Sequence, residues 1–189
     1  MALAVQKPPI SAAEALAVLR SSSEQASTGR RNRALIRLPR RAGLRPGEAL
    51  APRPGDVDLD RRALTVGDRV AGLDDPVAAE LGGWIDRRAE SALTGDGPFT
   101  PALQGKPLSP AHVRELLPGL GSCAGLAGRV HAMGLRYACA AEMAGEGIPT
   151  EIIESQLGIR PQSSVARYLT IADDADVVAA MAARPIPRG

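Results

Sequence analysis

The segment HAMGLRYACAAEMAGEG, residues 131–147, places an arginine near the start of a nearly all-apolar helix. Arg136 is followed by small and apolar residues on several faces of that helix, which indicates that the helix is buried. A buried guanidinium is costly unless an anionic group meets it. Arg136 therefore needs a partner, which is either a nearby acid such as Glu142 or Glu146 or an anion that a ligand brings.

A second constraint is the density of arginine between residues 30 and 45, although the whole chain has a formal net charge of only +2. A dense basic segment is a candidate phosphate-facing surface. The ordinary alternative is a solvated, arginine-rich helix in a chain that uses arginine in place of lysine, since Lys7 and Lys106 are its only lysines. Charge alone does not choose between the two.

Cysteine usage and hydropathy exclude several classes of protein. Cys123 and Cys139 are too few for a disulfide framework, and the N-terminus does not read as a signal peptide. No apolar run approaches the length of a membrane span. A zinc site that joins these cysteines to His112 and His131 is disfavoured, because the spacing contains no C-x-x-C pair. The composition predicts a soluble, cytoplasmic protein without a membrane partner.

Capping and turn residues predict a mostly helical chain with one small antiparallel hairpin. The hairpin is expected over residues 56–66, where Val57 and Leu59 alternate with charged residues before a turn and a second apolar run. Pro39 is expected to kink a helix over 28–43. Other helices are expected to begin at the capping box of Ser11, after Pro46 and at Asp75, and over 109–117, 134–145, 149–157, 163–170 and 173–183. One domain from residue 11 to 184 is expected.

Three stretches follow one another in an order that resembles a known family: AGLRPGEALAPRPGDVDL at 42–59, HAMGLRYACAAEMAGEGIPTEIIESQLG at 131–158 and SSVARYL at 163–169. Together they resemble the catalytic domain of the tyrosine recombinases, the phage integrase family. That family carries a T-G-L-R-x-x-E-L helix entry, a D-I-D-L strand, H-x-L-R-H on a buried helix, an L-G-H turn and a tyrosine in a short helix. The resemblance implies a mainly α fold with a small antiparallel β-sheet.

The resemblance also implies a chemistry on double-stranded DNA. Arg45 and Arg136 match two arginines that grip the non-bridging oxygens of the scissile phosphate, for which planar guanidiniums are suited. Tyr168 matches the nucleophile, whose attack leaves a 3′-phosphotyrosyl link for rejoining. Glu48 matches an acid that positions the first arginine. Site-specific DNA breakage and rejoining of this kind requires neither a metal nor a nucleotide cofactor.

Each of these residues also has an ordinary structural explanation. Arg45 is one more member of the arginine-rich segment, and Tyr168 lies in a helix where most tyrosines simply pack their rings. Arg136 is near Glu142 and Glu146 in sequence. The functional interpretation is favoured because all three matched residues occur together in the family's order and context.

Several positions depart from the family's pattern. Met133 and Tyr137 stand where the family has histidines around its second arginine, and Ile159 stands for the histidine of the L-G-H turn. The stretch at 66–75, VGDRVAGLDD, lacks the lysine that acts as general acid, and Arg69 there is a poor proton donor. Positioned acid–base groups contribute roughly 10²–10⁴ each to a rate. The sequence therefore indicates an impaired enzyme, or a non-catalytic DNA-binding or protein-interaction relic.

Two residues are candidates for replacing the lost groups: His131, which lies just upstream of the second arginine, and Lys106 in a loop. We further expect six arginines to contact DNA phosphates: Arg30, Arg31, Arg33, Arg37, Arg40 and Arg41. The family's N-terminal helical clamp domain is not expected, because so few residues precede the first helix. The helix over 173–183 is expected to pack on its own domain and to exchange between copies of the chain on DNA.

Overall fold

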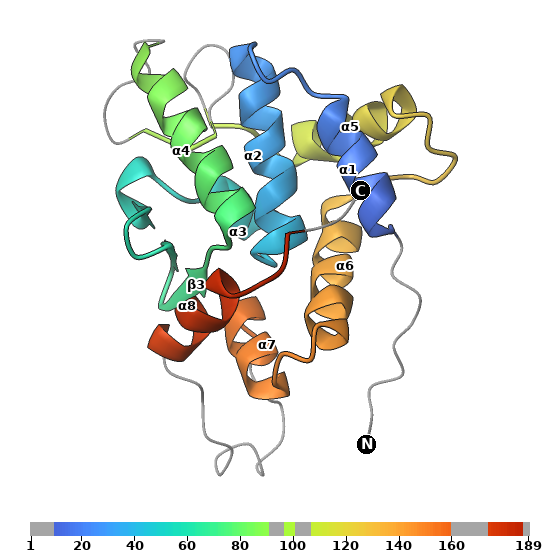
Figure 1. Cartoon of the computed structure of the whole chain (residues 1–189). Coiled ribbons are helices and arrows are strands. Elements are labelled where there is room, and N and C mark those ends of the chain that lie inside the picture. The colour runs from blue at the N-terminus through green and yellow to red at the C-terminus, as the bar shows by residue number, and fades with distance from the viewer. Residues whose placement is uncertain (1–9, 91–96, 101–106, 160–173, 187–189) are drawn as a thin grey trace.

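The structure is a computed structural model of the chain that describes residues 10–90, 97–100, 107–159 and 174–186 (Figure 1). These residues form a mainly helical fold with a three-stranded antiparallel sheet, so the fold class expected from the sequence is confirmed. Within the described ranges, no helix has the length and apolar character that crossing a membrane would demand.

Helix α2 (Ser27–Arg41) runs through the centre of the fold. Four helices pack against it: α1 (Ala12–Arg20), α3 (Pro46–Leu50), α4 (Asp75–Glu90) and α6 (Ala132–Gly145). Its sequence explains this position, because Leu38 packs into one hydrophobic cluster and Ile36 into another. Pro39 does not end the helix, which continues to Arg41. The residues on both sides of Pro39 are buried, and that burial stabilises the helical path.

The sheet has the strand order β1 (Val57–Asp58), β2 (Ala63–Val66), β3 (Arg69–Gly72). Leu64 lies opposite Val57 on one side and Ala71 on the other. The hairpin expected over 56–66 is β1 and β2, whereas the third strand was not predicted. Gly67 and Asp68 form the tight turn before β3, with Gly67 at a φ of 63°. Such a two-residue turn is a hairpin signal that could have revealed β3.

The remaining elements are short, apart from the helix after Ser109. They are η1 (Pro54–Asp56), α5 (Pro110–Cys123), α7 (Thr150–Leu157) and α8 (Asp174–Ala182). Ser109 caps α5 as expected, but the helix passes the predicted end at Leu117. The residues after Pro118 include buried Gly121 and partly buried Leu120, which packs on the core, so burial favours continuing the helix.

The core lies on both sides of α2. One cluster joins α2 to α4 and the sheet, and contains Trp84, whose indole N–H donates to the carbonyl of Phe99 at 2.7 Å. A second cluster joins α2 to α1, α5 and α6. Figure 1 shows α2 between these two groups of helices.

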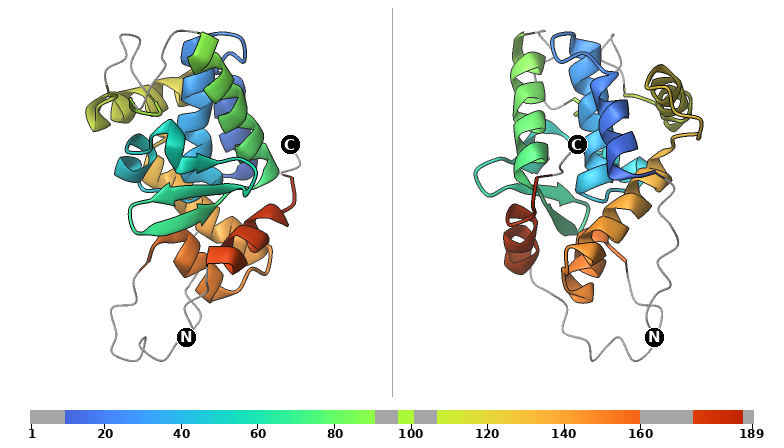
Figure 2. Two further views of the ribbon diagram at one scale, coloured as in Figure 1. Left: turned by 90° about the vertical axis from the view of Figure 1, so that its left-hand side faces the viewer. Right: turned by 45° about the vertical axis from the view of Figure 1, so that its right-hand side comes forward.

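Helix α8 packs in cis on strand β3, as expected from the sequence. Val177 and Met181 are buried, and a Cβ atom at Gly72 would lie 2.7 Å from the Met181 side chain. A glycine on β3 therefore allows the close approach of α8. The left view of Figure 2 faces the sheet, with α7 and α8 lying beside it.

Candidate functional site

The C-terminal end of α7 holds three guanidiniums from distant parts of the chain. Each donates to one of three consecutive carbonyls: Arg69 Nη1 to Gln156 at 2.7 Å, Arg136 Nη2 to Leu157 at 2.7 Å and Arg45 Nη2 to Gly158 at 3.0 Å. The last carbonyls of a helix have no intrahelical donors and carry partial negative charge. The end of α7 therefore positions cations from β3, from α6 and from the residue that precedes α3.

Glu48 lies close to all three guanidiniums. Its Oε2 accepts from Arg69 Nη2 at 3.0 Å and lies 3.8 Å from Arg136 Nη1, and its Oε1 lies 3.5 Å from Arg45 Nη1. Oε2 also accepts from the backbone N–H of Arg45 at 2.8 Å, which is the capping box of α3. This cap fixes the carboxylate. We call Arg45, Glu48, Arg69 and Arg136 the arginine site.

The arginine site keeps a positive charge, because it pairs three guanidiniums with a single carboxylate. Burial lowers the pKa of Arg136; Glu48 opposes this, whereas the charges of Arg45 and Arg69 add to it. An anion would relieve the repulsion among the three arginines. The side chain of Arg45 is 53% exposed, against 15% for Arg69 and 6% for Arg136, so a ligand would approach past Arg45.

The structure brings Arg45 and Arg136 together, as the sequence predicted, around the acid that the resemblance assigned to the first arginine. Arg136 also donates to the carbonyl of Gly43. Its nearest acid is Glu48, so the alternative pairing with Glu142 or Glu146 is wrong. Glu142 lies further along α6, Glu146 caps the C-terminal end of that helix, and both pair with other arginines.

Two of the predicted site residues, Tyr168 and Lys106, lie outside the described residues. Their roles stay predictions. His131 is the N-cap of α6, where its Nδ1 accepts from the backbone N–H of Gly134 at 2.9 Å. That hydrogen bond satisfies one of the free donors at the start of the helix. The structure therefore gives His131 a structural role beside the auxiliary role expected from the sequence.

The positions that depart from the family's pattern adjoin the arginine site in the chain. Tyr137, next to Arg136, is 55% exposed, and Ile159, next to Gly158, is 44% exposed. Both are large side chains with little packing. Solvent, or a partner, therefore reaches them.

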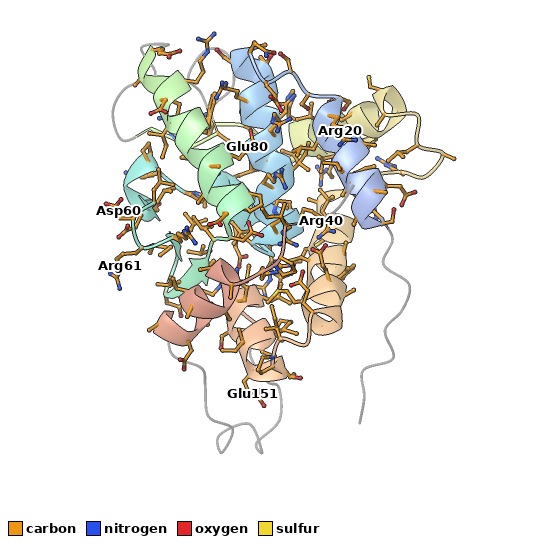
Figure 3. The ribbon with its side chains drawn as sticks, viewed as in Figure 1. Arg20, Arg40, Asp60, Arg61, Glu80 and Glu151 are labelled. Atoms are coloured by element: carbon orange, nitrogen blue, oxygen red, sulfur yellow. The ribbon has the colours of Figure 1, made fainter. Side chains whose placement is uncertain are left out.

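The arginine-rich helix α2 does not present the basic surface expected from its composition. Arg31, Arg33, Arg40 and Arg41 are buried. Acids from other elements pair with Arg33, Arg40 and Arg41, and Arg31 donates to the side-chain oxygen of Asn32. Arg33 Nε lies 2.8 Å from Glu80 on α4, which Figure 3 shows beside α2. The expectation that these arginines face DNA is therefore corrected.

The other two arginines of that group are also engaged within the protein. Arg37 Nε lies 3.9 Å from the Glu80 carboxylate, and Arg30 Nη1 donates to the carbonyl of Gly83 at 3.2 Å. Both side chains therefore face α4. They are partly exposed, so contact of these two arginines with DNA stays a prediction.

A buried ion network connects α2, α6 and the residues after α8. Arg40, labelled in Figure 3, joins α2 to α6, because its Nη1 lies 2.6 Å from Glu142 Oε2. Arg184 Nε lies 2.7 Å from Glu146, and its Nη2 lies 3.0 Å from Glu142. Burial raises the pKa of Glu142, but hydrogen bonds and charges from Arg40 and Arg41 outweigh it and hold this pKa below its usual value.

Sequence reasoning missed a buried glutamine that aligns the site. Gln156 is 0% exposed; its Oε1 accepts from Gly72 N at 2.9 Å, and its Nε2 donates to the carbonyls of Gly72 and Ala42 at 3.0 Å each. These bonds tie α7 to β3 and to the end of α2. A signal was present, because Gln156 lies at helical spacing from Ile152 and Ile153 on the apolar face of α7.

The sequence profile of the Phage integrase family matches residues 10–174. No curated protein is significantly similar to the chain in sequence. The match therefore rests on the family as a whole and spans most of the described residues, including every member of the arginine site.

Solved structures share the fold. The XerA recombinase structure is 21% identical with a TM-score of 0.73, covering 88% of this chain and 59% of that one. The integrase from mycobacterium phage Brujita is 18% identical with a TM-score of 0.69, covering 96% and 58%. The XerH site-specific recombinase bound to a palindromic difH substrate is 22% identical with a TM-score of 0.66, covering 82% and 48%. This chain therefore spans 48–59% of the length of these three proteins.

Proposed function

Because this chain belongs to the phage integrase family, we propose that it is a site-specific recombinase domain that breaks and rejoins strands of double-stranded DNA. The observation that carries the proposal is the convergence of Arg45 and Arg136, from separate elements, on the single carboxylate of Glu48. Guanidiniums held this close are suited to the two non-bridging oxygens of one phosphodiester. XerH, which shares the fold, has been solved on its DNA substrate, and this supports DNA as the partner.

In the proposed reaction, the phenol of Tyr168 gives its proton to solvent and its oxygen attacks phosphorus. A phosphotyrosyl bond to the 3′ side forms while the bond to the 5′-oxygen breaks, and that oxygen takes a proton from solvent. Arg45 and Arg136 stabilise the charge that grows on the phosphoryl oxygens. Attack by the 5′-hydroxyl reverses the step and rejoins the strand, so no metal or nucleotide cofactor is needed.

Cleavage is expected to be slow. The positions of the family's lysine and histidines hold no comparable acid or base, and each such group contributes roughly 10²–10⁴ to a rate. These factors rarely multiply cleanly. Assembly on DNA through exchange of α8 between copies, and a cytoplasmic location, stay predictions that accompany this proposal.

The experiment is a search for a covalent adduct on nicked duplexes of randomised sequence, because the target site is unknown. Denatured reactions of the full chain are expected to contain a protein–DNA adduct, which peptide mass spectrometry assigns to Tyr168. Tyr168→Phe should abolish it. Tyr137→Phe is the matched control, because Tyr137 is the only other tyrosine in the chain and should leave the adduct intact. An adduct on Tyr137 would contradict the assignment.

A DNA-binding module without catalysis is a second candidate function. The observation that favours it is that Tyr137 and Ile159 are exposed at positions where the family has histidines, and neither supplies an imidazole. Saturable binding to duplex DNA with no adduct at long reaction times would favour this function over the enzyme. Binding of either kind is expected to weaken as salt rises, because phosphate contacts release counterions.

A further inference from the structure

We infer that Arg69 is a third phosphate-binding guanidinium of the arginine site, in addition to the two arginines that the quoted family motifs supply. The ligand is a phosphodiester of the DNA backbone, so the inference rests on the proposed function. Arg69 would supply charge rather than a proton, because an arginine side chain keeps its proton at any physiological pH.

The contacts of Arg69 place it beside the second arginine of the site. Its Nη2 and Arg136 Nη1 approach the same oxygen, Glu48 Oε2, at 3.0 and 3.8 Å. Two guanidiniums that share one carboxylate oxygen can also share one oxygen of a phosphate. The sheet fixes this position, because Arg69 pairs with Val66 directly across the turn between β2 and β3.

A glycine makes room for the Arg69 side chain at the end of α7. A Cβ atom at Gly158 would lie 2.4 Å from Arg69 Nε, and Gly158 has a φ of 61°, which L side chains rarely adopt. The absence of a side chain at Gly158 therefore allows both the left-handed end of α7 and the close passage of Arg69. The local structure is built around this arginine.

Charge argues for a ligand rather than for a purely structural link. One carboxylate, Glu48, meets three guanidiniums, and each guanidinium has five N–H donors. Arg69 uses one of its nitrogens for the carbonyl of Gln156 and another for Glu48, and its side chain is 15% exposed. A structural link alone would need no excess of positive charge at a solvent-accessible position.

The test is a titration of the full chain with inorganic phosphate, followed by NMR of the arginine Nε–Hε groups. Arg69→Gln is expected to weaken phosphate binding about tenfold, comparable to the loss of one charge-assisted hydrogen bond. Arg69→Lys retains the charge and should lose less. The control is Arg87→Gln, which removes a 37% exposed arginine paired with Glu90 at the far end of α4 and should leave binding unchanged.

A second measurement separates ligand contact from structural support. A plot of the logarithm of the DNA-binding constant against the logarithm of the salt concentration has a negative slope. In Arg69→Gln this salt slope should become shallower by about one, because one phosphate contact is lost. Phosphate affinity and salt slope that match wild type in both Arg69 variants would overturn this inference and leave the proposed function standing. Wild-type protein that binds no phosphate would overturn the proposed function and, with it, this inference.

Discussion

Arg41 Nε and Asp74 Oδ2 lie 2.6 Å apart in an ion pair whose two side chains are at most 1% exposed. The pair joins the end of α2 to the start of α4, where Asp74 Oδ1 also accepts from the backbone N–H of Val77 at 3.0 Å. Composition alone assigned this arginine to a DNA surface. Its position shows instead that part of the basic character of α2 serves the fold.

Arg41→Gln is therefore expected to destabilise the protein. The substitution leaves Asp74 charged and buried without its partner, which costs about 3–5 kcal/mol. Denaturant unfolding measures this change. Arg20→Gln, at the exposed end of α1, is the control and should stay within about 0.5 kcal/mol of wild type. Full stability of Arg41→Gln together with weaker DNA binding would show that Arg41 acts on DNA after all.

Local sequence signals predicted most of the helices because each signal is a property of a few neighbouring residues. The capping box at Ser11 and the cap at Ser109 both form as expected. The two arginines of the site were also found, because the resemblance fixes them by motif. The burial of α2 could not be predicted in this way. Acids from α4, α6 and the residues next to these two helices pair with the arginines of α2. No local sequence pattern indicates which distant carboxylate pairs with which guanidinium.

The rest of the site depends on contacts across the fold. In the sequence Arg69 stood out only as a poor proton donor. The features that place it in the arginine site are its charge and its proximity to Glu48, and the proximity is visible only in the folded structure. Gln156 acts by joining β3 to α7, and that relationship exists only once both elements are placed. Tertiary pairing, rather than propensity, positions these side chains.

Glu142→Gln is expected to flatten the acid side of the stability profile. Burial raises the pKa of Glu142, but Arg40 and Arg41 outweigh this and hold the pKa below its usual value of 4.5, so the folded state binds this proton less readily than the unfolded chain. The resulting stability is present above about pH 4.5 and is lost as the pH falls through the folded-state pKa.

The measurement for Glu142 is the melting temperature between about pH 3 and pH 7. The melting temperature of the wild-type protein should fall steeply at the acid end. At neutral pH the free energy of unfolding of Glu142→Gln should be about 3–5 kcal/mol below that of wild type, and the melting temperature of this variant should change less on acidification. Glu115→Gln, an exposed position on α5, is the control and should follow wild type. Parallel curves for wild type and Glu142→Gln would disprove the pairing.

Gln156→Leu should destabilise the fold and disturb the arginine site together. The leucine leaves the N–H and carbonyl of Gly72 and the carbonyl of Ala42 without these partners, at about 1–3 kcal/mol for each buried group. Unfolding and phosphate titration measure the two effects. Gln25→Leu, at an exposed position, should change neither. Loss of stability with unchanged phosphate binding would show that Gln156 does not align Arg69.

Gly158→Ala tests the space occupied by Arg69. The positive φ at this position destabilises an alanine by about 1–2 kcal/mol relative to glycine. The alanine Cβ would also collide with Arg69 Nε. Gly125→Ala is a matched control, because Gly125 has a φ of 75° and open space around it. Both variants should lose stability, but only Gly158→Ala should weaken phosphate binding. Equal phosphate affinity in the two variants would refute the close packing of Arg69 against Gly158.

Removal of residues 174–189 should lower the melting temperature of the DNA-free monomer. The truncation exposes β3 where Val177 and Met181 pack, and it removes Arg184, whose 0% exposed side chain meets Glu146 and Glu142. A loss of about 3–5 kcal/mol corresponds to a fall of roughly 10 °C in a domain of this size. A shorter truncation after Ala183 keeps α8 but removes Arg184, so it should show part of that fall.

Exchange of α8 between copies on DNA must break the same ion pairs, and Arg184→Gln should therefore favour DNA-dependent oligomers. Unchanged thermal stability after the longer truncation, with loss of those oligomers, would mean that α8 acts in trans.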